Sequence, residues 1–287
     1  MSLVLGSRDF GDRACAVMAI VNRTPDSFYD TGATYDEDAA LDRVAAVVAE
    51  GADIVDIGGV KAGYGETVDE AEEVRRTASM VERVRGEYPG LVISVDTWRS
   101  GVARELCHRG ADLINDTWSG ADPQLAEVAA EFDVGLVCSH TGGLPPRTDP
   151  HRVGYDDVVA DVIATVTSLA ERAVSLGVRR DRILVDPTHD FGKNTYHSLE
   201  LTRRLDEVVA TGWPVLVALS NKDFVGETLD LPVLERLPGT LAATAVSAWL
   251  GARVFRAHQV SQTRQVLDMV ASIAGWRPPS QALRGLA

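Results

Sequence analysis

Short apolar runs rich in β-forming residues recur eight times along the 287 residues, and each is followed by a segment with helical spacing. This alternation is typical of parallel β/α units, in which the chain returns through a helix after every strand. Strands are expected at Cys15–Asn22, Ala52–Gly59, Leu91–Thr97, Leu113–Trp118, Val134–His140, Ile183–Thr188, Pro214–Ser220 and Val254–Val260. Helices are expected at Glu37–Glu50, Glu66–Arg85, Ser100–Arg109, Pro123–Phe132, Tyr155–Leu176, Tyr196–Ala210, Leu234–Gly251 and Ser261–Ala274. Eight such units close a barrel more naturally than they fill an open sheet, so the expected fold class is α/β, a single (β/α)8 TIM barrel.

The whole chain, residues 1–287, is expected to form one domain, with 1–14 as a lead-in and 276–287 as a tail. A net charge of -14 disfavours nucleic acids and anionic membrane surfaces as partners, because both require clustered Lys and Arg. The first residues contain no apolar run of leader length, which predicts a cytoplasmic protein. Cys138 and His140 could pair as a nucleophile and base, but a small buried thiol is the preferred interpretation.

Polar residues stand at the end of every expected strand. They are Asn22, Asp56, Asp96, Asn115, His140, Asp186, Ser220 with Lys222, and Arg256 with His258. In a β/α barrel these positions meet at one rim, where active sites are built. Helix capping accounts for Asn115 or Asp56 taken singly, but not for the whole set.

The chain has only three lysines, and all follow expected strands on the rim side: Lys61, Lys193 and Lys222. We interpret them as cations required at that face, although Lys61 alone fits a solvated loop equally well. Lys222, Arg256 and His258 follow strands seven and eight, where such barrels commonly bind phosphate, and they suit a pyrophosphate.

The other half of the rim offers acceptors and amides from Asp96, Asn115 and Asp186, which fit a planar nitrogen heterocycle rich in N–H donors. A metal cluster of His140, His189 and His258 is a weaker alternative.

The residues at the strand ends and in the loops that follow them resemble the dihydropteroate synthases of folate biosynthesis, over nearly the whole chain. The most specific match is Asn22-Arg23-Thr24-Pro25-Asp26-Ser27-Phe28, which is similar to the family's N-x-T-P-D-S-F loop. The supporting segments are Asp56-Ile57-Gly58-Gly59, Ser94-Val95-Asp96-Thr97, Ile114-Asn115-Asp116, Asp186-Pro187 with Phe191-Gly192-Lys193, and Arg256-Ala257-His258.

The resemblance implies condensation of a dihydropterin methyl pyrophosphate with 4-aminobenzoate, which releases pyrophosphate. It implies that Asp96, Asn115, Asp186 and Lys222 hold the pterin, and that Asn22, Arg256 and His258 hold the pyrophosphate. Of these, the resemblance makes Asn22, Lys222, Arg256 and His258 the catalytic group. It also implies a Mg²⁺ ion at Asn22 and a homodimer, with which the apolar stretch Leu241–Trp249 is compatible.

The chain departs from the family pattern where the second substrate would bind. The family's Glu-Ser-Thr-Arg-Pro-Gly after Gly59 is replaced, and the altered acceptor loop consists of Val60, Lys61, Ala62, Gly63 and Tyr64. Asn221 replaces an Arg, Arg23 replaces an apolar residue, and Thr188, His189 and Asp190 stand for Gly-Ile-Gly. If those glycines use positive φ, the substitutions strain the loop.

We therefore expect a divergent paralogue that binds a pterin pyrophosphate with weak or lost synthase activity. Three alternatives stay open: a working dihydropteroate synthase, a pterin-using transferase with a different amine acceptor, and a non-catalytic regulatory partner.

Overall fold

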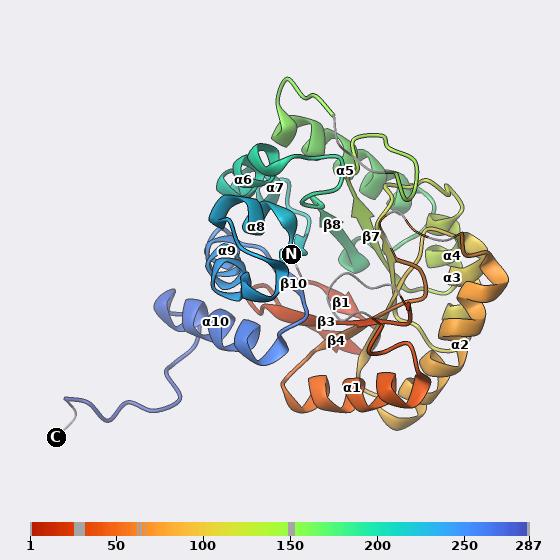
Figure 1. Ribbon diagram of the computed structural model, residues 1–287, viewed down its shortest axis with the longest axis horizontal. Helices are drawn as coiled ribbons and strands as arrows, with labels where there is room; N and C mark the ends of the chain where they lie inside the picture. Colours follow the sequence, from red (N-terminus) through yellow and green to blue (C-terminus); the bar gives the residue numbers. More distant parts are fainter. Residues whose placement is uncertain are drawn as a thin grey trace.

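The computed structural model describes residues 2–25, 32–61, 63, 65, 67–148 and 153–285. Its main sheet has eight parallel strands in the order β8-β7-β6-β5-β4-β3-β10-β9. Their bounds are β3 Ala16–Asn22, β4 Ile54–Gly58, β5 Val92–Asp96, β6 Leu113–Asp116, β7 Gly135–Ser139, β8 Ile183–Asp186, β9 Leu216–Val217 and β10 Val254–Ala257. A parallel bridge between Val185 and Val215 joins the two outer strands and closes the ring. The predicted TIM barrel is confirmed (Figure 1).

Helices surround the barrel, close to the predicted ranges (Figure 1). They are α1 Glu37–Ala49, α2 Glu70–Glu87, α3 Ser100–His108, α4 Leu125–Glu131, α5 Val158–Ser175, α6 Thr195–Arg203, α7 Leu205–Val209, α8 Asp223–Leu229, α9 Leu237–Trp249 and α10 Val260–Ile273. The helices α2, α4, α5 and α9 start later than predicted. In two of them an aspartate caps the first turn: Asp69 precedes α2 and Asp157 precedes α5. Each cap carboxylate accepts backbone N–H groups that lack helical partners.

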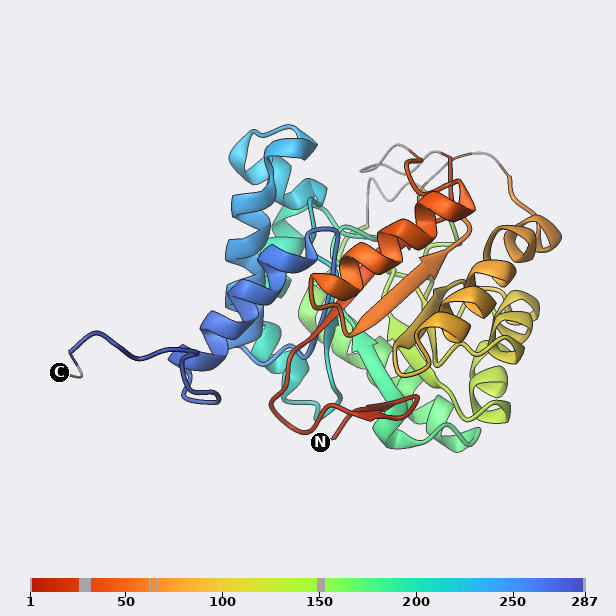
Figure 2. The ribbon, with the colours of Figure 1, turned by 90° about the horizontal axis from the view of Figure 1, so that it is seen from below.

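Several short elements were not predicted. The predicted helix at Tyr196–Ala210 divides into α6 and α7 around Arg204, and the short helix α8 follows β9. Strands β1 (Val4–Leu5) and β2 (Arg8–Asp9) pair as a hairpin within the expected lead-in. Figure 2 shows this hairpin across one end of the barrel, and the tail after α10 extends away from the body.

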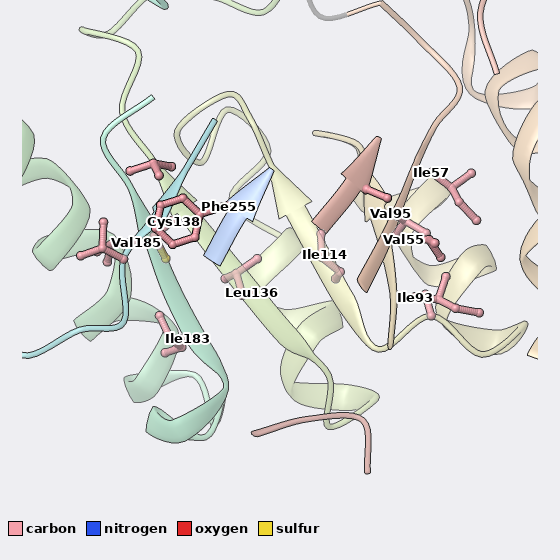
Figure 3. Packing of buried hydrophobic residues seen from close by; sticks show 14 of the residues in the cluster. Val55, Ile57, Ile93, Val95, Ile114, Leu136, Cys138, Ile183, Val185 and Phe255 are labelled. Carbon is pink, nitrogen blue, oxygen red and sulfur yellow. The ribbon is translucent and has the colours of Figure 1, made fainter. Parts of the chain in front are cut away.

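Side chains alternate along each strand between two buried layers. Val55, Ile57, Ile93 and Val95 belong to the larger cluster, between the strands and the helices (Figure 3). Cys138 lies in that cluster as well, so its thiol is buried and packs in the core, which was the preferred interpretation from the sequence.

The smaller cluster fills the barrel itself. Its members are Leu3, Leu5, Phe10, Ala16, Met18, Ile54, Val92, Leu113, Val137, Leu184, Leu216 and Val254. Leu3 and Leu5 come from the N-terminal hairpin segment and cover the amino-terminal end of this interior. Two residues further along the strands, on the same face, the inward positions become polar, as at Asp56, Ser94 and Arg256. The barrel interior is therefore apolar at one end and charged at the carboxyl end.

Within the described part of the chain, no helix combines the length and apolar character needed to cross a bilayer.

Candidate functional site

The centre of the barrel mouth is a guanidinium shared by two carboxylates. Arg256 on β10 donates from Nε to Asp56 Oδ2 at 2.6 Å and from Nη2 to Asp96 Oδ2 at 2.9 Å. Asn115 Nδ2 donates to the same Asp56 oxygen at 3.1 Å, and Ser94 Oγ donates to Asp56 Oδ1 at 2.6 Å. Residues up to 200 positions apart in the chain thus meet at one point. The strand register brings them together, because it aligns Asp56 with Ser94 and Asp96 with Asn115.

The Asp96 carboxylate has a strongly raised pKa. Burial is the main reason that the pKa of Asp96 is raised to about 7. The positive charge of Arg256 opposes this rise, and the negative charge of Asp56 contributes to it. Asp96 also accepts a hydrogen bond from Thr117 Oγ1 at 2.8 Å, which lowers its pKa. Asp96 therefore titrates near neutral pH.

Asp186 and Lys222 form the next part of the mouth. Asp186 ends β8, and its Oδ1 accepts the backbone N–H of Thr188 at 2.7 Å. Lys222 precedes α8, where its Nζ donates to the His189 carbonyl and lies 5.0 Å from the Phe191 ring centroid. Burial raises the pKa of Asp186, and the charge of Lys222 lowers it. The two side chains therefore offer an acceptor and a donor at the mouth of the barrel.

His258 contributes a hydrogen-bonding ring to the mouth. Its Nδ1 lies 3.0 Å from Ser220 Oγ, and its backbone carbonyl accepts from Arg43 Nη2 at 2.5 Å. Burial lowers the pKa of His258 to about 3, and the charges of Arg256 and Arg43 act in the same direction. The imidazole is therefore neutral at pH 7, which corrects its interpretation as part of a cationic cluster.

Asn22 ends β3 beside Gly58, whose register partners are Asn22 and Asp96. A Cβ atom on Gly58 would lie 3.5 Å from Asn22 Oδ1 and 3.5 Å from Asp96 Cβ. These are ordinary van der Waals distances, so Gly58 lies between the Asn22 amide and the Asp96 side chain. Among the described residues there is no group of three or more His, Cys, Asp or Glu that could hold a metal, so the alternative cluster of His140, His189 and His258 is not supported.

Lys193 has a different place from the predicted rim cation. Its side chain is buried, and Nζ contacts four acceptors: His140 Nδ1 at 2.8 Å and the carbonyls of His140, Thr188 and Phe191 at 3.0, 3.1 and 2.9 Å. Burial lowers the pKa of Lys193 to about 7. The ammonium thus ties the loop after β8 to the end of β7. Local sequence carries no signal for this, because the four acceptors belong mostly to backbone.

His140 connects Lys193 to the surface. Its Nε2 lies 2.7 Å from Asp161 Oδ1, and Asp161 is half-exposed on α5. Burial lowers the pKa of His140 to about 4, and the charge of Lys193 lowers it further. Both ring nitrogens of His140 are bonded to these two partners, so His140 does not form the nucleophile–base pair with Cys138.

The loop after β8 carries the strain predicted from its substitutions. Thr188 has φ of 53° and Asp190 has φ of 69°, both in the left-handed region that glycine adopts at little cost. Thr188 is β-branched, for which this conformation is a genuine outlier. Its Oγ1 accepts the His140 N–H at 3.2 Å and donates to the Asp186 carbonyl at 2.9 Å. These bonds compensate for part of the strain.

The altered acceptor loop is described only in part. Val60 is buried, Lys61 is partly exposed, and Gly63 accepts a hydrogen bond from Arg147 Nε at 3.2 Å. Ala62 and Tyr64 lie outside the described residues, as do Asp26, Ser27 and Phe28 of the first loop.

Arg23, another departure, is buried beside this loop. Its Nε donates to the Arg76 carbonyl at 2.9 Å, and Arg76 Nη1 donates to the Gly59 carbonyl at 3.0 Å. An arginine pair therefore braces the backbone at the start of the altered loop.

Comparison with known proteins agrees with this geometry. A family model described as "Pterin binding enzyme" matches residues 18–258, from within β3 to just beyond β10. A curated Mycobacterium tuberculosis protein named inactive dihydropteroate synthase 2 is 61% identical over 281 residues, covering 96% of this chain and 88% of that protein. The chain belongs to the dihydropteroate synthase family. Its Mycobacterium leprae relative, also named inactive dihydropteroate synthase 2, is 60% identical and covers 100% of this chain and 99% of its own.

A solved dihydropteroate synthase from Yersinia pestis, in complex with a sulfonamide drug, has a TM-score of 0.90 at 32% identity. The alignment covers 96% of this chain and all of that one. The family resemblance found in the sequence is thereby confirmed.

Within this dihydropteroate synthase homologue, Asp56 is the residue whose importance the sequence did not indicate. It stands at a strand end, but nothing local indicates that its carboxylate holds Arg256.

Proposed function

We propose that this chain binds a dihydropterin methyl pyrophosphate and has weak or no dihydropteroate synthase activity. The observation that carries the proposal is the cluster of Asp96, Asn115 and Arg256 at the carboxyl end of the barrel. Carboxylate and amide groups can match the donors and acceptors of a pterin ring, and the guanidinium is suited to a pyrophosphate. The names of the two mycobacterial relatives support the loss of activity.

Each half of the ligand has a proposed set of partners. Asp96, Asn115, Asp186 and Lys222 hold the pterin, while Asn22, Arg256 and His258 hold the pyrophosphate. In a working enzyme, stabilising the leaving pyrophosphate makes the pterin methylene electrophilic before the amine attacks. Arg256 is paired with Asp56 and Asp96, so a pyrophosphate must compete with these carboxylates for its guanidinium. This competition weakens binding of the pyrophosphate.

A Mg²⁺ ion is the proposed cofactor, with Asn22 as its ligand. Mg²⁺ prefers oxygen donors and is often bound by one or two protein groups together with substrate phosphates. The carbonyl oxygen of the Asn22 amide, which lies beside Gly58, fits this mode. The ion would neutralise charge on the pyrophosphate, and Arg256 and His258 would orient that group.

The proposed setting is the cytoplasm and the proposed assembly is a homodimer. Large apolar side chains are exposed on the neighbouring helices α9 and α10, namely Val246, Trp249, Met269 and Ile273. Burying them against a second copy would remove this apolar surface from water. Sedimentation velocity should give a dimer that Trp249→Glu dissociates. A monomeric wild-type protein at micromolar concentration would exclude the dimer.

Calorimetric titration with a dihydropterin methyl pyrophosphate, with and without Mg²⁺, tests the binding proposal. Binding that strengthens with Mg²⁺ and is abolished by Asn115→Leu is expected, because leucine has similar volume and no hydrogen-bonding groups. Absence of binding under both conditions would overturn the proposal.

A further inference from the structure

Asp190 is a partly buried carboxylate at a position where the family pattern has glycine. Its backbone takes φ of 69°, and its two carboxylate oxygens have separate partners. Oδ1 accepts from Ser198 Oγ at 2.9 Å, and Oδ2 accepts from the backbone N–H of Phe224 at 3.2 Å. The side chain is therefore held in one orientation by α6 on one side and α8 on the other.

This orientation sets Asp190 against Lys222. Phe224 is the second residue of α8, and Lys222 is the residue that caps that helix. Lys222 in turn reaches back to the carbonyl of His189, directly before Asp190. The two segments thus hold each other, and the Asp190 carboxylate is fixed on the loop that the Lys222 ammonium binds. In agreement with this arrangement, burial lowers the pKa of Lys222, and the negative charge of Asp190 is the largest influence that raises it.

The consequence is that carboxylates outnumber the cations assigned to ligand binding in the mouth. Among the described residues on the walls, Lys222 and Arg256 are the cations assigned to ligand binding. They are accompanied by four carboxylates: Asp56, Asp96, Asp186 and Asp190. A pyrophosphate brings further negative charge, which an additional carboxylate in a poorly solvated site repels. A neutral pterin is not subject to this repulsion.

We propose that Asp190 is a specificity-determining residue that lowers the affinity of the site for a pyrophosphate-bearing pterin relative to an uncharged pterin. Asp190 partly neutralises Lys222 and leaves the pterin ring contacts of Asp96 and Asn115 unchanged. The inference rests on the proposed function, since it assumes that the mouth holds a pterin. Beyond that function, the inference states that aspartate in place of the family's glycine at position 190 shifts the preference of the site from the charged to the uncharged pterin.

The test compares Asp190→Asn with a matched control, Asp223→Asn. Asparagine tolerates positive φ, and its amide can accept from Phe224 and donate to Ser198, so the loop keeps its contacts. Asp223 lies next to Lys222 in the chain, and Asp223→Asn removes the same charge as Asp190→Asn. The Asp223 side chain is 80% exposed, so water screens its charge. Calorimetry on the full chain uses three probes: hydroxymethyl dihydropterin, its pyrophosphate ester, and inorganic pyrophosphate with Mg²⁺.

Asp190→Asn should tighten binding of the ester and of inorganic pyrophosphate on the order of tenfold, estimated from Coulomb interactions at an intermediate dielectric. The dissociation constant of the uncharged pterin should stay within about twofold of its wild-type value. Asp223→Asn should change the dissociation constant of none of the three probes by more than about twofold.

Equal changes for charged and uncharged pterins, or no change for any probe, would overturn the inference. If neither pterin binds but Asp190→Asn still tightens inorganic pyrophosphate, the proposed function fails and the electrostatic role of Asp190 stands. Unfolding midpoints of the variants establish that each is folded, and Asp190→Gly, which restores the family's residue, provides a second variant with the same expected direction.

Discussion

Removing the guanidinium of Arg256 should make the stability of the protein strongly dependent on pH. Arg256→Met keeps an unbranched side chain of similar length but leaves Asp56 and Asp96 without their shared cation. Both carboxylates are largely buried, with side-chain exposures of 0% and 12%. Breaking a buried ion pair by removing one partner typically costs about 3–5 kcal/mol, and we expect a loss in this range at pH 8.

The pH dependence follows from Asp96. In the wild-type fold its pKa is raised from 3.8 to about 7, an interval worth roughly 4 kcal/mol. A carboxyl with a raised pKa contributes full stability below the pKa of the unfolded chain and loses that contribution as pH rises through its folded pKa. Without Arg256 the pKa of Asp96 rises further. The variant should therefore recover much of its lost stability at pH 5.5, where Asp96 is protonated.

Urea unfolding at pH 5.5 and 8.0 measures this effect in four proteins: wild type, Arg256→Met, Asp96→Asn and the double variant. At pH 8 the double variant should be about 2–3 kcal/mol more stable than the sum of the single losses predicts, because the neutral amide introduced by Asp96→Asn needs no cation. An Arg256→Met loss that is equal at both pH values, or strictly additive effects in the double variant, would refute the reasoning.

Three further predictions concern the loops around the mouth. Thr188→Gly relieves strain but leaves the His140 N–H without its acceptor, so unfolding should become easier by about 1 kcal/mol, and a rise in thermal midpoint would contradict this. Lys193→Met leaves several buried acceptors without a donor and should cost about 3 kcal/mol in urea unfolding, whereas a neutral effect would show that the ammonium is dispensable. Replacing residues 60–65 with Glu-Ser-Thr-Arg-Pro-Gly should raise dihydropteroate formation above wild type, and no gain would place the defect elsewhere.

Much of the barrel could be predicted because its pattern is local. Alternating side chains along Ile54–Gly58 face the interior and the helices in turn, and the polar residues at the strand ends mark the mouth. The late starts of α2 and α5, directly after the caps Asp69 and Asp157, show where local reasoning fell short, since cap geometry decides the boundary. The hairpin before β3 depends on burying Leu3 and Leu5 against distant strands.

The candidate site was predicted as a set of residues but not as a set of contacts. Nothing in the order of the chain shows that Arg256 is shared between Asp56 and Asp96, because that follows from ring closure and strand register. Lys193 was expected at the rim and is instead buried among backbone carbonyls, which a sequence cannot position. The strain at Thr188 and Asp190 was predictable, since losing a glycine has a direct conformational cost.

The most direct test is a steady-state assay of dihydropteroate formation. The chain is supplied with 4-aminobenzoate, Mg²⁺ and enough pterin pyrophosphate to saturate the site by calorimetry, beside a working family enzyme. We predict product formation at least a hundredfold slower than in that enzyme, since the loop for the acceptor amine is altered while the pterin residues are retained. Turnover equal to that of the working enzyme would contradict the account.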